Sequence, residues 1–491
     1  MIGRRVPAPL LLAAFLLLVG AFDVLTLRPG HDWGDDFAQY IHHAKNIALG
    51  IDYNRTGYIW NPHFPMLGPP TYPPVFPLLL APVYAAAGLN LSAMKVVVVV
   101  SFLAALIVIA RVFREMLPGP YLAALLVLLG LNPYFWHLKD NILSDLPFLF
   151  FVYLSLDLIQ RHPGPEAFRP RALLFATAIG LSCYLAYGTR SLGAVLILCL
   201  IASDWIRWRR LTWISAFAIA CFLVLAVAQS ALTHRDTGYA SILTFDPRRI
   251  AANLVEYARY LSGLWDNAWW GSGDTVLLVL FGGLAVVGFW LRVRSGIGPL
   301  EIFAVLYGLA ILPWVATQGR YLVPLMPLYI GYALRGVQTD RLRAPRRARL
   351  VLATLLVLAG TGFASEYATV RWDRSPEGVG TAHAAALFQA VRQWTDPEAV
   401  VVFQKPRALA LFTDRRATGI HDTADEVDLW SYIGRVGASY AILGPDDRVF
   451  LYQDRIRSLI RHHPDQFSPV YSNPDFSLYR ILPAGTGKPR P

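Results

Sequence analysis

Two aspartates that follow the first long apolar stretch are the first residues of this chain that could do chemistry. Asp35 and Asp36 lie in HDWGDDFAQYIHHAKNIALG, at the start of a stretch with a helical pattern. A carboxylate can take a proton from an acceptor hydroxyl during a transfer reaction. It can also cap a helix, because an aspartate at that position satisfies free backbone N–H groups. As an isolated pair, the two residues fit both roles equally well.

A third carboxylate and three cationic side chains lie at the ends of other apolar runs. Asp145 precedes such a run in HLKDNILSDLPFLFF, which also holds Lys139, and Arg190 and Arg320 lie in AYGTRSLG and TQGRYLVPLMP. A charge costs roughly 2–3 kcal/mol toward the centre of a membrane helix, so it usually faces a polar cavity. Arginine forks suit phosphate oxygens, although an arginine at a span end most often only snorkels toward water. Carboxylates and cations together predict a site that takes a proton from a hydroxyl and stabilises a phosphate leaving group.

The elements that position these residues are predicted to be membrane helices. Of the 491 residues 55% are hydrophobic and only 16% are charged, and the mean hydropathy is +0.43. Several apolar stretches reach the roughly 20 residues that a helix needs to cross a bilayer. The expected fold class is therefore mainly α, a polytopic transmembrane bundle of about eleven spans with a C-terminal α/β domain. The predicted spans are 10–27, 92–113, 120–136, 145–160, 172–187, 191–206, 212–231, 274–291, 300–316, 321–335 and 349–364.

The segment 73–88 decides the predicted orientation. It is apolar but short, and Pro74, Pro77 and Pro82 interrupt it. If it does not cross, the arginine clusters at the span ends all lie on one side, which the positive-inside rule identifies as the cytoplasm. We therefore expect a multi-pass protein of the cytoplasmic membrane with a cytoplasmic N-terminus and with the candidate residues at the outer face. These arginines also account for the net charge of +11 without a nucleic-acid partner.

Aromatic side chains at the outer face are candidates for contact with a sugar or an acceptor. Trp269 and Trp270 lie in the predicted outer loop 232–273, and Tyr321 follows Arg320. Aromatic rings stack on sugar rings, but tryptophans near span ends more often form the interfacial belt of a membrane protein.

The composition changes to that of a soluble domain near Tyr367. AVVVF and SYAILG are typical of buried strands, the segments before, between and after them are typical of helices, and a closing hairpin is expected around Asn473-Pro474. The predicted domains are 1–366, a transmembrane catalytic domain, and 367–491, an extracytoplasmic α/β domain. No Gly-rich phosphate loop follows a strand, so nucleotide binding is not expected. Acceptor recognition, a lid and a purely structural role all remain open for this domain.

The order of these pieces resembles the GT-C superfamily of lipid-phosphate-sugar-dependent glycosyltransferases. It is close to protein O-mannosyltransferases, the lipid A aminoarabinose transferase and the RgtA/B/C/D-like bacterial enzymes. The resemblance covers most of residues 1–335 and rests on the order of the matching segments as well as on their residues. These segments are GDDFAQYIHHAKNIALG, YPPVFPLLLAPVYAAAGLN, ILSDLPFLFFVYLSL, YGTRSLG and GRYLVPLMPLY.

The resemblance implies roles for individual residues. The family's acidic pair falls on Asp35 and Asp36, of which the first is the usual catalytic carboxylate, and the acidic residue of its second loop falls on Asp145. Asp35 would activate the acceptor or help to bind a divalent metal, and Asp145 would support it. The aminoarabinose transferase has a basic residue before its Pro-Pro pair, whereas this chain has Tyr72. The other candidates for the donor phosphate, proposed on position alone, are Arg190, Arg320 and Lys139.

The resemblance implies an inverting glycosyltransferase. It would transfer a sugar from a polyprenyl-phosphate donor to a lipid, glycan or protein acceptor of the cell envelope, and it would need no nucleotide sugar. The main alternative is a transporter or flippase of lipid-linked sugars. Such proteins usually show repeated halves and ionisable residues near the middle of the membrane, and this sequence shows neither. A catalytically inactive scaffold with the same fold is a second alternative.

Overall fold

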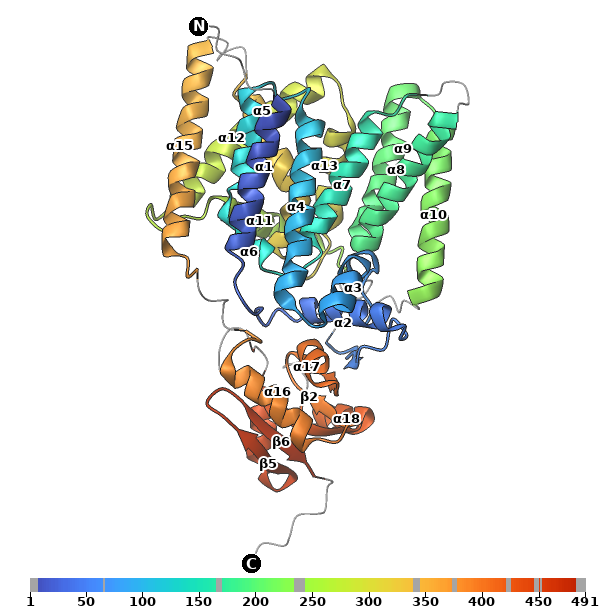
Figure 1. Ribbon diagram of the computed structural model, residues 1–491, viewed down its shortest axis with the longest axis vertical. Helices are drawn as coiled ribbons and strands as arrows, with labels where there is room; N and C mark the ends of the chain where they lie inside the picture. Colours follow the sequence, from blue (N-terminus) through green and yellow to red (C-terminus); the bar gives the residue numbers. More distant parts are fainter. Residues whose placement is uncertain are drawn as a thin grey trace, which may run out of the picture. The chain divides into compact units, whose positions relative to one another are not determined.

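The computed structural model is mainly helical and contains one six-stranded sheet (Figure 1). It describes residues 8–64, 67–164, 170–233, 243–338, 345–372, 378–420, 425–445, 450 and 453–482. The chain divides into two compact units. The helical unit comprises Met1–Leu27, Lys95–Leu232 and Leu243–Trp372, and the sheet unit comprises Arg28–Met94, Thr233–Ile242 and Asp373–Pro491.

The helical unit is built from long apolar helices joined by short connections. Its α-helices are α1 (Ala8–Leu25), α4 (Leu91–Phe113, which begins in the sheet unit), α5 (Pro120–Gly130), α6 (Pro133–Lys139), α7 (Asp145–Gln160), α8 (Pro170–Thr189), α9 (Val195–Trp208), α10 (Trp213–Thr233), α11 (Pro247–Ser262), α12 (Gly273–Ser295), α13 (Pro299–Ile311), α14 (Met326–Gly336) and α15 (Pro345–Thr369). Its described residues also form the 3₁₀ turns η2 (Ser191–Ala194), η4 (Gly263–Trp265) and η5 (Gly319–Leu325).

The helices identify a multi-pass membrane protein. Six of the described helices are long and apolar enough to cross a bilayer, or seven if the bent pair α5 and α6 forms one span. Each of the eleven predicted stretches coincides with helical structure, but several of these helices are shorter than a bilayer requires. The number of crossings therefore stays a prediction. The predicted outer loop 232–273 contains the amphipathic helix α11.

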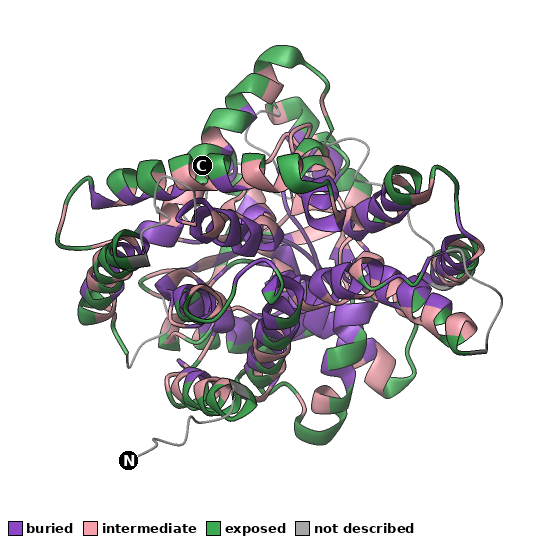
Figure 2. Cartoon of the chain, turned by 90° about the horizontal axis from the view of Figure 1, so that it is seen from above, coloured by how far each residue is buried: buried purple, intermediate pink, exposed green. Residues whose placement is uncertain are grey.

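The burial pattern separates central helices from peripheral ones (Figure 2). On α4, Phe102, Leu106 and Ile109 are fully or almost fully buried, whereas Val279 and Val286 on α12 are more than 60% exposed. Exposed valines on an 18-residue apolar window fit contact with lipid, because lipid tails solvate such side chains as well as a protein core does.

Two glycines allow α12 and α14 to approach closely. A Cβ atom added to Gly288 would lie 1.8 Å from the carbonyl oxygen of Tyr332, and one added to Gly336 would lie 2.1 Å from that of Leu284. These are backbone atoms, which cannot move aside as a flexible side chain can. Small residues at such crossings are the usual basis of helix packing in membranes.

We expect Gly288→Ala to lower the melting temperature of the detergent-purified protein. Overpacking typically costs about 1–3 kcal/mol, and helix propensity returns only about 1 kcal/mol of this. Gly283→Ala is the matched control, because it lies on the same helix and a Cβ there would meet no atom within 4 Å. Equal melting temperatures for the two variants would contradict the close contact.

The sheet unit combines the segment after α1 with the C-terminal part of the chain. Its helices are α2 (Asp36–Leu49), α3 (Val75–Ala87), α16 (Ala382–Trp394), α17 (Pro406–Thr413), α18 (Glu426–Val436), α19 (Asp454–His462) and the 3₁₀ turn η7 (Pro464–Gln466). Its strands are β1 (Tyr58–Ile59), β2 (Val400–Val402), β3 (Arg416–Thr418), β4 (Ala438–Leu443), β5 (Phe467–Ser472) and β6 (Ser477–Ile481). This grouping differs from the predicted division at residue 366, because residues 28–94 cluster with the C-terminal segment.

The sheet has the strand order β1-β3-β2-β4-β6-β5. The first four strands in this order are parallel, and β6 is antiparallel to both β4 and β5. The predicted strands AVVVF and SYAILG are present as β2 and β4, and the predicted hairpin around Asn473-Pro474 joins β5 to β6. The elements β1, β3 and α17 were not predicted.

Helix α3 coincides with the segment that decided the predicted orientation. Its 13 residues give a length of about 20 Å at 1.5 Å per residue, well short of the roughly 30 Å of a bilayer core. Pro82 lies inside the helix. Its length therefore favours the interpretation that this segment does not cross the membrane.

Candidate functional site

Four of the predicted site residues come together in the helical unit. We call Asp145, Arg190, Arg320 and Tyr321 the carboxylate–arginine cluster. Asp145 is the first residue of α7, Arg190 lies between α8 and η2, and the other two lie in η5. The cluster therefore joins three breaks in apolar helices, where side chains can leave the helix surface at different angles.

Hydrogen bonds hold these breaks in place. Tyr307 on α13 donates from its hydroxyl to the carbonyl of Tyr321 at 3.0 Å, and Tyr153 on α7 donates to that of Pro324 at 3.2 Å. Both bonds fix η5 against neighbouring helices. Gly193 permits the tight turn after Arg190, because a Cβ there would lie 2.4 Å from the backbone nitrogen of Tyr187.

Asp145 forms ion pairs with both arginines. Arg190 donates from Nη1 to Oδ1 of Asp145, and Nη1 of Arg320 lies 4.0 Å from Oδ2. The carboxylate is 1% exposed, the arginine side chains are 14% and 20% exposed, and the Arg190 guanidinium lies 5.3 Å above the Tyr321 ring. Ser144 occupies the N-cap position, so the carboxylate of Asp145 serves the arginines and is not a cap.

The carboxylate–arginine cluster carries more positive than negative charge. Two guanidinium groups face one carboxylate, and Oδ2 of Asp145 has no hydrogen-bond partner among the described residues. Two guanidinium groups fixed close together create a positive local potential, which favours the approach of an anion. A phosphate group suits this position, because arginine binds it through two parallel N–H bonds.

A second group of residues lies in the sheet unit. We call Asp35, Asp36, Tyr72 and Arg407 the first-loop cluster. The hydroxyl of Tyr72 donates to Oδ1 of Asp36 at 2.5 Å, and Nη1 of Arg407 donates to the same oxygen at 3.0 Å and to the Tyr72 hydroxyl at 2.6 Å. Asp36 and Tyr72 are thus bound to a cation from α17, more than 330 residues away in the sequence.

Asp35 has the geometry of a reactive carboxylate. It occupies the N-cap position of α2, yet its side chain makes no cap bond; instead, Oδ1 accepts the backbone N–H of Ala408 at 2.9 Å. Oδ2 is buried and has no hydrogen-bond partner among the described residues. The residue has φ = 48°, a strained conformation for a non-glycine residue. Burial raises the pKa of Asp35, although the nearby Arg407 opposes this change.

The segment that carries Asp35 is anchored by Trp33. Its buried ring packs edge-on against Phe388, Phe403, Phe450 and Phe476, with ring centroids 5.2 to 6.0 Å apart. Aromatic pairs of this kind are worth about 0.5–1.5 kcal/mol each beyond the area that they bury. The anchor helps to maintain the strained backbone two residues later.

Arg407 is the site residue that sequence reasoning missed. It is 1% exposed, and its guanidinium lies 4.8 Å and 4.9 Å from the rings of Tyr58 and Tyr72. Burial by itself would lower the pKa of Arg407, but Tyr72, Tyr58 and the carboxylates of Asp36 and Asp35 raise it above the usual value. The segment KPRALALFTD could have indicated the helix that carries Arg407, because a proline begins a short amphipathic helix there, between two strands.

The other predicted residues have different surroundings. Lys139 is fully buried, and its Nζ lies 3.3 Å from Oδ2 of Asp140 and 2.9 Å from the carbonyl of Thr26, contacts that favour a structural role. Trp269 is 60% exposed and Trp270 is half-buried. In the part of the chain that the structure describes, no hydrogen bond or ring contact joins these tryptophans to the carboxylate–arginine cluster.

The described residues include no group of three or more His, Cys, Asp or Glu side chains that could hold a metal ion.

No protein-family model matches this sequence, and no curated protein matches it significantly. Solved structures do match the fold. Residues that make up 98% of this chain superpose on 99% of ArnT from Cupriavidus metallidurans bound to undecaprenyl phosphate, with a TM-score of 0.60 and 16% identity. The oligosaccharyltransferase AglB from Archaeoglobus fulgidus, in complex with an inhibitory peptide and a dolichol-phosphate, matches 88% of this chain over 69% of its own (TM-score 0.57, 11% identity).

The arabinofuranosyltransferase AftD from Mycobacteria gives a TM-score of 0.60 at 14% identity. The match includes 98% of this chain but only 40% of AftD, so this chain spans less than half the length of that enzyme. ArnT, AglB and AftD are GT-C membrane glycosyltransferases, and at these identities the similarity concerns the fold. The chain therefore has the fold of the GT-C superfamily of membrane glycosyltransferases.

Proposed function

We propose that this protein is a glycosyltransferase that transfers a sugar from a polyprenyl-phosphate donor to an acceptor of the cell envelope. The observation that carries the proposal is the carboxylate–arginine cluster, in which two guanidinium groups flank the single buried carboxylate of Asp145. An excess of positive charge between apolar helices suits a phosphate group that is attached to a long hydrocarbon chain.

The structural neighbours support the same donor class. ArnT is described with bound undecaprenyl phosphate and AglB with a dolichol-phosphate. Because one fold can host different functions, the fold alone does not decide the activity. The proposal places the reaction at the outer face of the cytoplasmic membrane, as the arginine distribution of the sequence predicts.

On the donor side, Arg190 and Arg320 would bind the phosphate oxygens. When the bond between the anomeric carbon and the phosphate oxygen breaks, the departing phosphate gains negative charge. Guanidinium groups fixed beforehand stabilise this charge without reorganisation. Asp145 would act as a positioning residue, since its ion pairs fix the direction of both arginines.

On the acceptor side, Asp35 would act as the general base. The acceptor oxygen forms a bond to the anomeric carbon while the bond to phosphate breaks, and the acceptor proton passes to Oδ2 of Asp35. This oxygen has no hydrogen-bond partner among the described residues, and a raised pKa makes the carboxylate a stronger base. A single displacement of this kind inverts the configuration of the sugar.

We expect Arg190→Gln to lower the transfer of radiolabelled sugar from a polyprenyl-phosphate donor to a crude envelope acceptor extract. A hydrogen bond to a charged group contributes about 1.5–3 kcal/mol, which corresponds to a rate loss of roughly 10- to 100-fold. Arg320→Gln should reduce transfer less, because Arg320 lies farther from Asp145.

The other end of α7 offers the matched control. Asp157 also pairs with two arginines, Arg111 at 2.8 Å and Arg161 at 2.9 Å, but these arginines are 48% and 45% exposed. Arg111→Gln should leave transfer unchanged, because Arg111 pairs with Asp157 near the opposite end of α7 from Asp145, and Asp157 keeps Arg161. If Arg111→Gln reduces transfer as much as Arg190→Gln does, the assignment of the phosphate site fails. If no donor is consumed while a lipid-linked sugar is still bound, the transporter or flippase alternative gains.

A further inference from the structure

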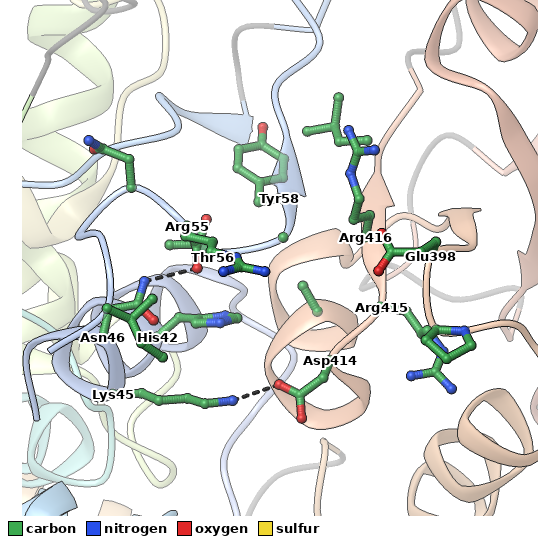
Figure 3. Close-up of a pocket in the computed structure, with 16 residues that line it drawn as sticks. His42, Lys45, Asn46, Arg55, Thr56, Tyr58, Glu398, Asp414, Arg415 and Arg416 are labelled. Atoms are coloured by element: carbon green, nitrogen blue, oxygen red, sulfur yellow. Dashed lines mark hydrogen bonds and ion pairs between the residues drawn. The ribbon is translucent and has the colours of Figure 1, made fainter. Parts of the chain in front are cut away.

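A cavity in the sheet unit has features of a ligand site that the proposed reaction does not use (Figure 3). Its volume is about 430 Å³, within the range of roughly 300–1,000 Å³ typical of small-molecule sites. One wall comes from α2 and the segment that leads into β1, and the other comes from the end of α17, the start of β3 and the residues before β2. The walls are more than 330 residues apart in the sequence.

Backbone pairing fixes the two walls of the cavity. Strands β1 and β3 are parallel, with Tyr58 opposite Ala417 and Ile59 opposite Thr418. The N–H of Ala417 donates to the carbonyl of Gly57 at 2.9 Å, and the hydroxyl of Thr418 donates to that of Ile59 at 3.0 Å. Because the strands are parallel and in this register, the residues that precede both strands lie at the same end of the pair.

Two arginines at that end are available to a ligand. Arg55 precedes β1 by three residues and Arg416 is the first residue of β3; both are exposed and line the cavity. In Figure 3 the Arg55 guanidinium lies between the two walls. Within the described parts of the chain, neither guanidinium makes a hydrogen bond or an ion pair.

Several other polar side chains of the cavity either have partners within the protein or are neutral at pH 7. Lys45 pairs with Asp414 at 2.6 Å, and Arg415 donates to Thr395 and to backbone carbonyls. Burial lowers the pKa of His42 to about 4, so its ring is neutral at pH 7. Four cationic and two anionic side chains line the cavity, which leaves an excess of two positive charges.

We propose that this cavity binds a saccharide that carries a phosphate or a carboxylate group. Arg55 and Arg416 would hold the oxyanion, because arginine forks match its geometry. Glu398, which also lines the cavity, and the neutral His42 suit the hydroxyl groups of a sugar. The cavity is much larger than a phosphate ion needs. The proposal rests on the proposed function only in the choice of a saccharide as the ligand.

The test is isothermal titration calorimetry on the full-length, detergent-purified protein. Glucose 1-phosphate and galacturonic acid supply the two oxyanions, and glucose and inorganic phosphate supply the sugar and the anion separately. The Asp35→Asn variant serves as the parent protein, so that turnover does not contribute heat. Binding is thus measured separately from transfer, and a failure of the proposed transferase activity would leave this result interpretable.

The variants should change affinity in opposite directions. Arg55→Gln and Arg416→Gln should each weaken binding of the charged sugar about tenfold, since each removes a charge-assisted hydrogen bond. Asp414→Asn should strengthen binding about threefold, because it frees the charge of Lys45. Asparagine also tolerates the left-handed conformation of residue 414 at φ = 55°. Arg461→Gln, an exposed arginine of α19 that does not line the cavity, should change nothing.

Binding of either charged sugar, weakened by the two arginine changes and strengthened by Asp414→Asn, supports the proposal, and the better of the two ligands identifies the oxyanion. Four results would overturn it. The first two are binding of glucose, or of inorganic phosphate, with the same affinity as the charged sugar. The third is no binding of any probe. The fourth is binding that depends on Arg55 only when vesicles of anionic lipid replace the sugar as the probe. Melting temperatures of all variants exclude a folding defect as the cause of any loss.

Discussion

Asp35→Asn is expected to lower sugar transfer by about a hundredfold or more, because it removes the general base of the proposed reaction. The measurement is the transfer of radiolabelled sugar from a polyprenyl-phosphate donor to an envelope acceptor extract. The variant should still fold. Asparagine retains an oxygen that can accept the Ala408 N–H bond, and it tolerates positive φ better than most residues.

The melting temperature separates loss of chemistry from loss of structure. Burial raises the pKa of Asp35, so folding disfavours the charged form of this group relative to the unfolded chain. The stability contributed by this group is complete below its unfolded pKa and is lost as pH rises through the raised folded pKa. At neutral pH Asp35→Asn should therefore be at least as stable as the wild type. Wild-type activity should in turn fall, as the solution is made acidic, at a higher pH than an ordinary aspartate would give.

Asp32→Asn is the matched control for this prediction. Asp32 lies in the same loop, is 41% exposed, and accepts the N–H of Gly34 through an oxygen that asparagine also has. Its transfer activity should remain close to that of the wild type. An active Asp35→Asn variant, or an equally inactive Asp32→Asn variant, would rule out Asp35 as the base.

Arg407→Ala is expected to destabilise the folded protein by about 3–5 kcal/mol, the usual effect of removing one partner of a buried ion pair. The change leaves Asp36 and Tyr72 without their shared cation. It also removes the bond from Nη2 to the carbonyl of Pro69 at 3.2 Å. The measurement is thermal or denaturant unfolding of the detergent-purified protein.

A double-mutant cycle tests whether this loss comes from the first-loop cluster. Asp36→Asn combined with Arg407→Ala should cost clearly less than the sum of the single changes, because residues that share an ion pair are not independent. Arg435→Ala, at the exposed end of α18, is the control and should cost less than about 1 kcal/mol. Additive losses for Asp36 and Arg407 would show that they do not act together.

Part of the candidate site could be predicted from the sequence. Charges at the ends of apolar runs need a polar partner, which indicated Asp145, Arg190 and Arg320, and Tyr321 was a candidate aromatic contact; the structure brings these four together. The same argument does not distinguish a cation that binds a ligand from one that only stabilises the fold. Lys139 met the same criterion, yet its ammonium group lies among Asp140, Thr26 and Trp136.

The contacts of Arg407 could not be predicted in this way, because α17 and residues 35–72 are far apart in the sequence and no short-range pattern connects them. Hydrophobic periodicity identifies long helices and strands well, but β1 has only two residues and β3 only three. Their pairing is specified by tertiary contacts such as that of Thr418 with Ile59. Each predicted apolar stretch coincides with helical structure, because an apolar run shows its character without reference to distant residues, whereas α11 lies in a segment that was predicted as a loop.

The strand order has a consequence for how the chain is made. Strand β1 is synthesised more than 330 residues before β3, its neighbour in the sheet. Non-local pairing of this kind slows folding, and a nascent chain would hold an unpaired β1 until the last quarter of the protein is complete. Residues 373–491 produced alone would in turn expose β3 as an open edge, a known hazard for aggregation. A soluble fragment for crystallisation or binding studies should therefore include residues 28–94, joined by a linker.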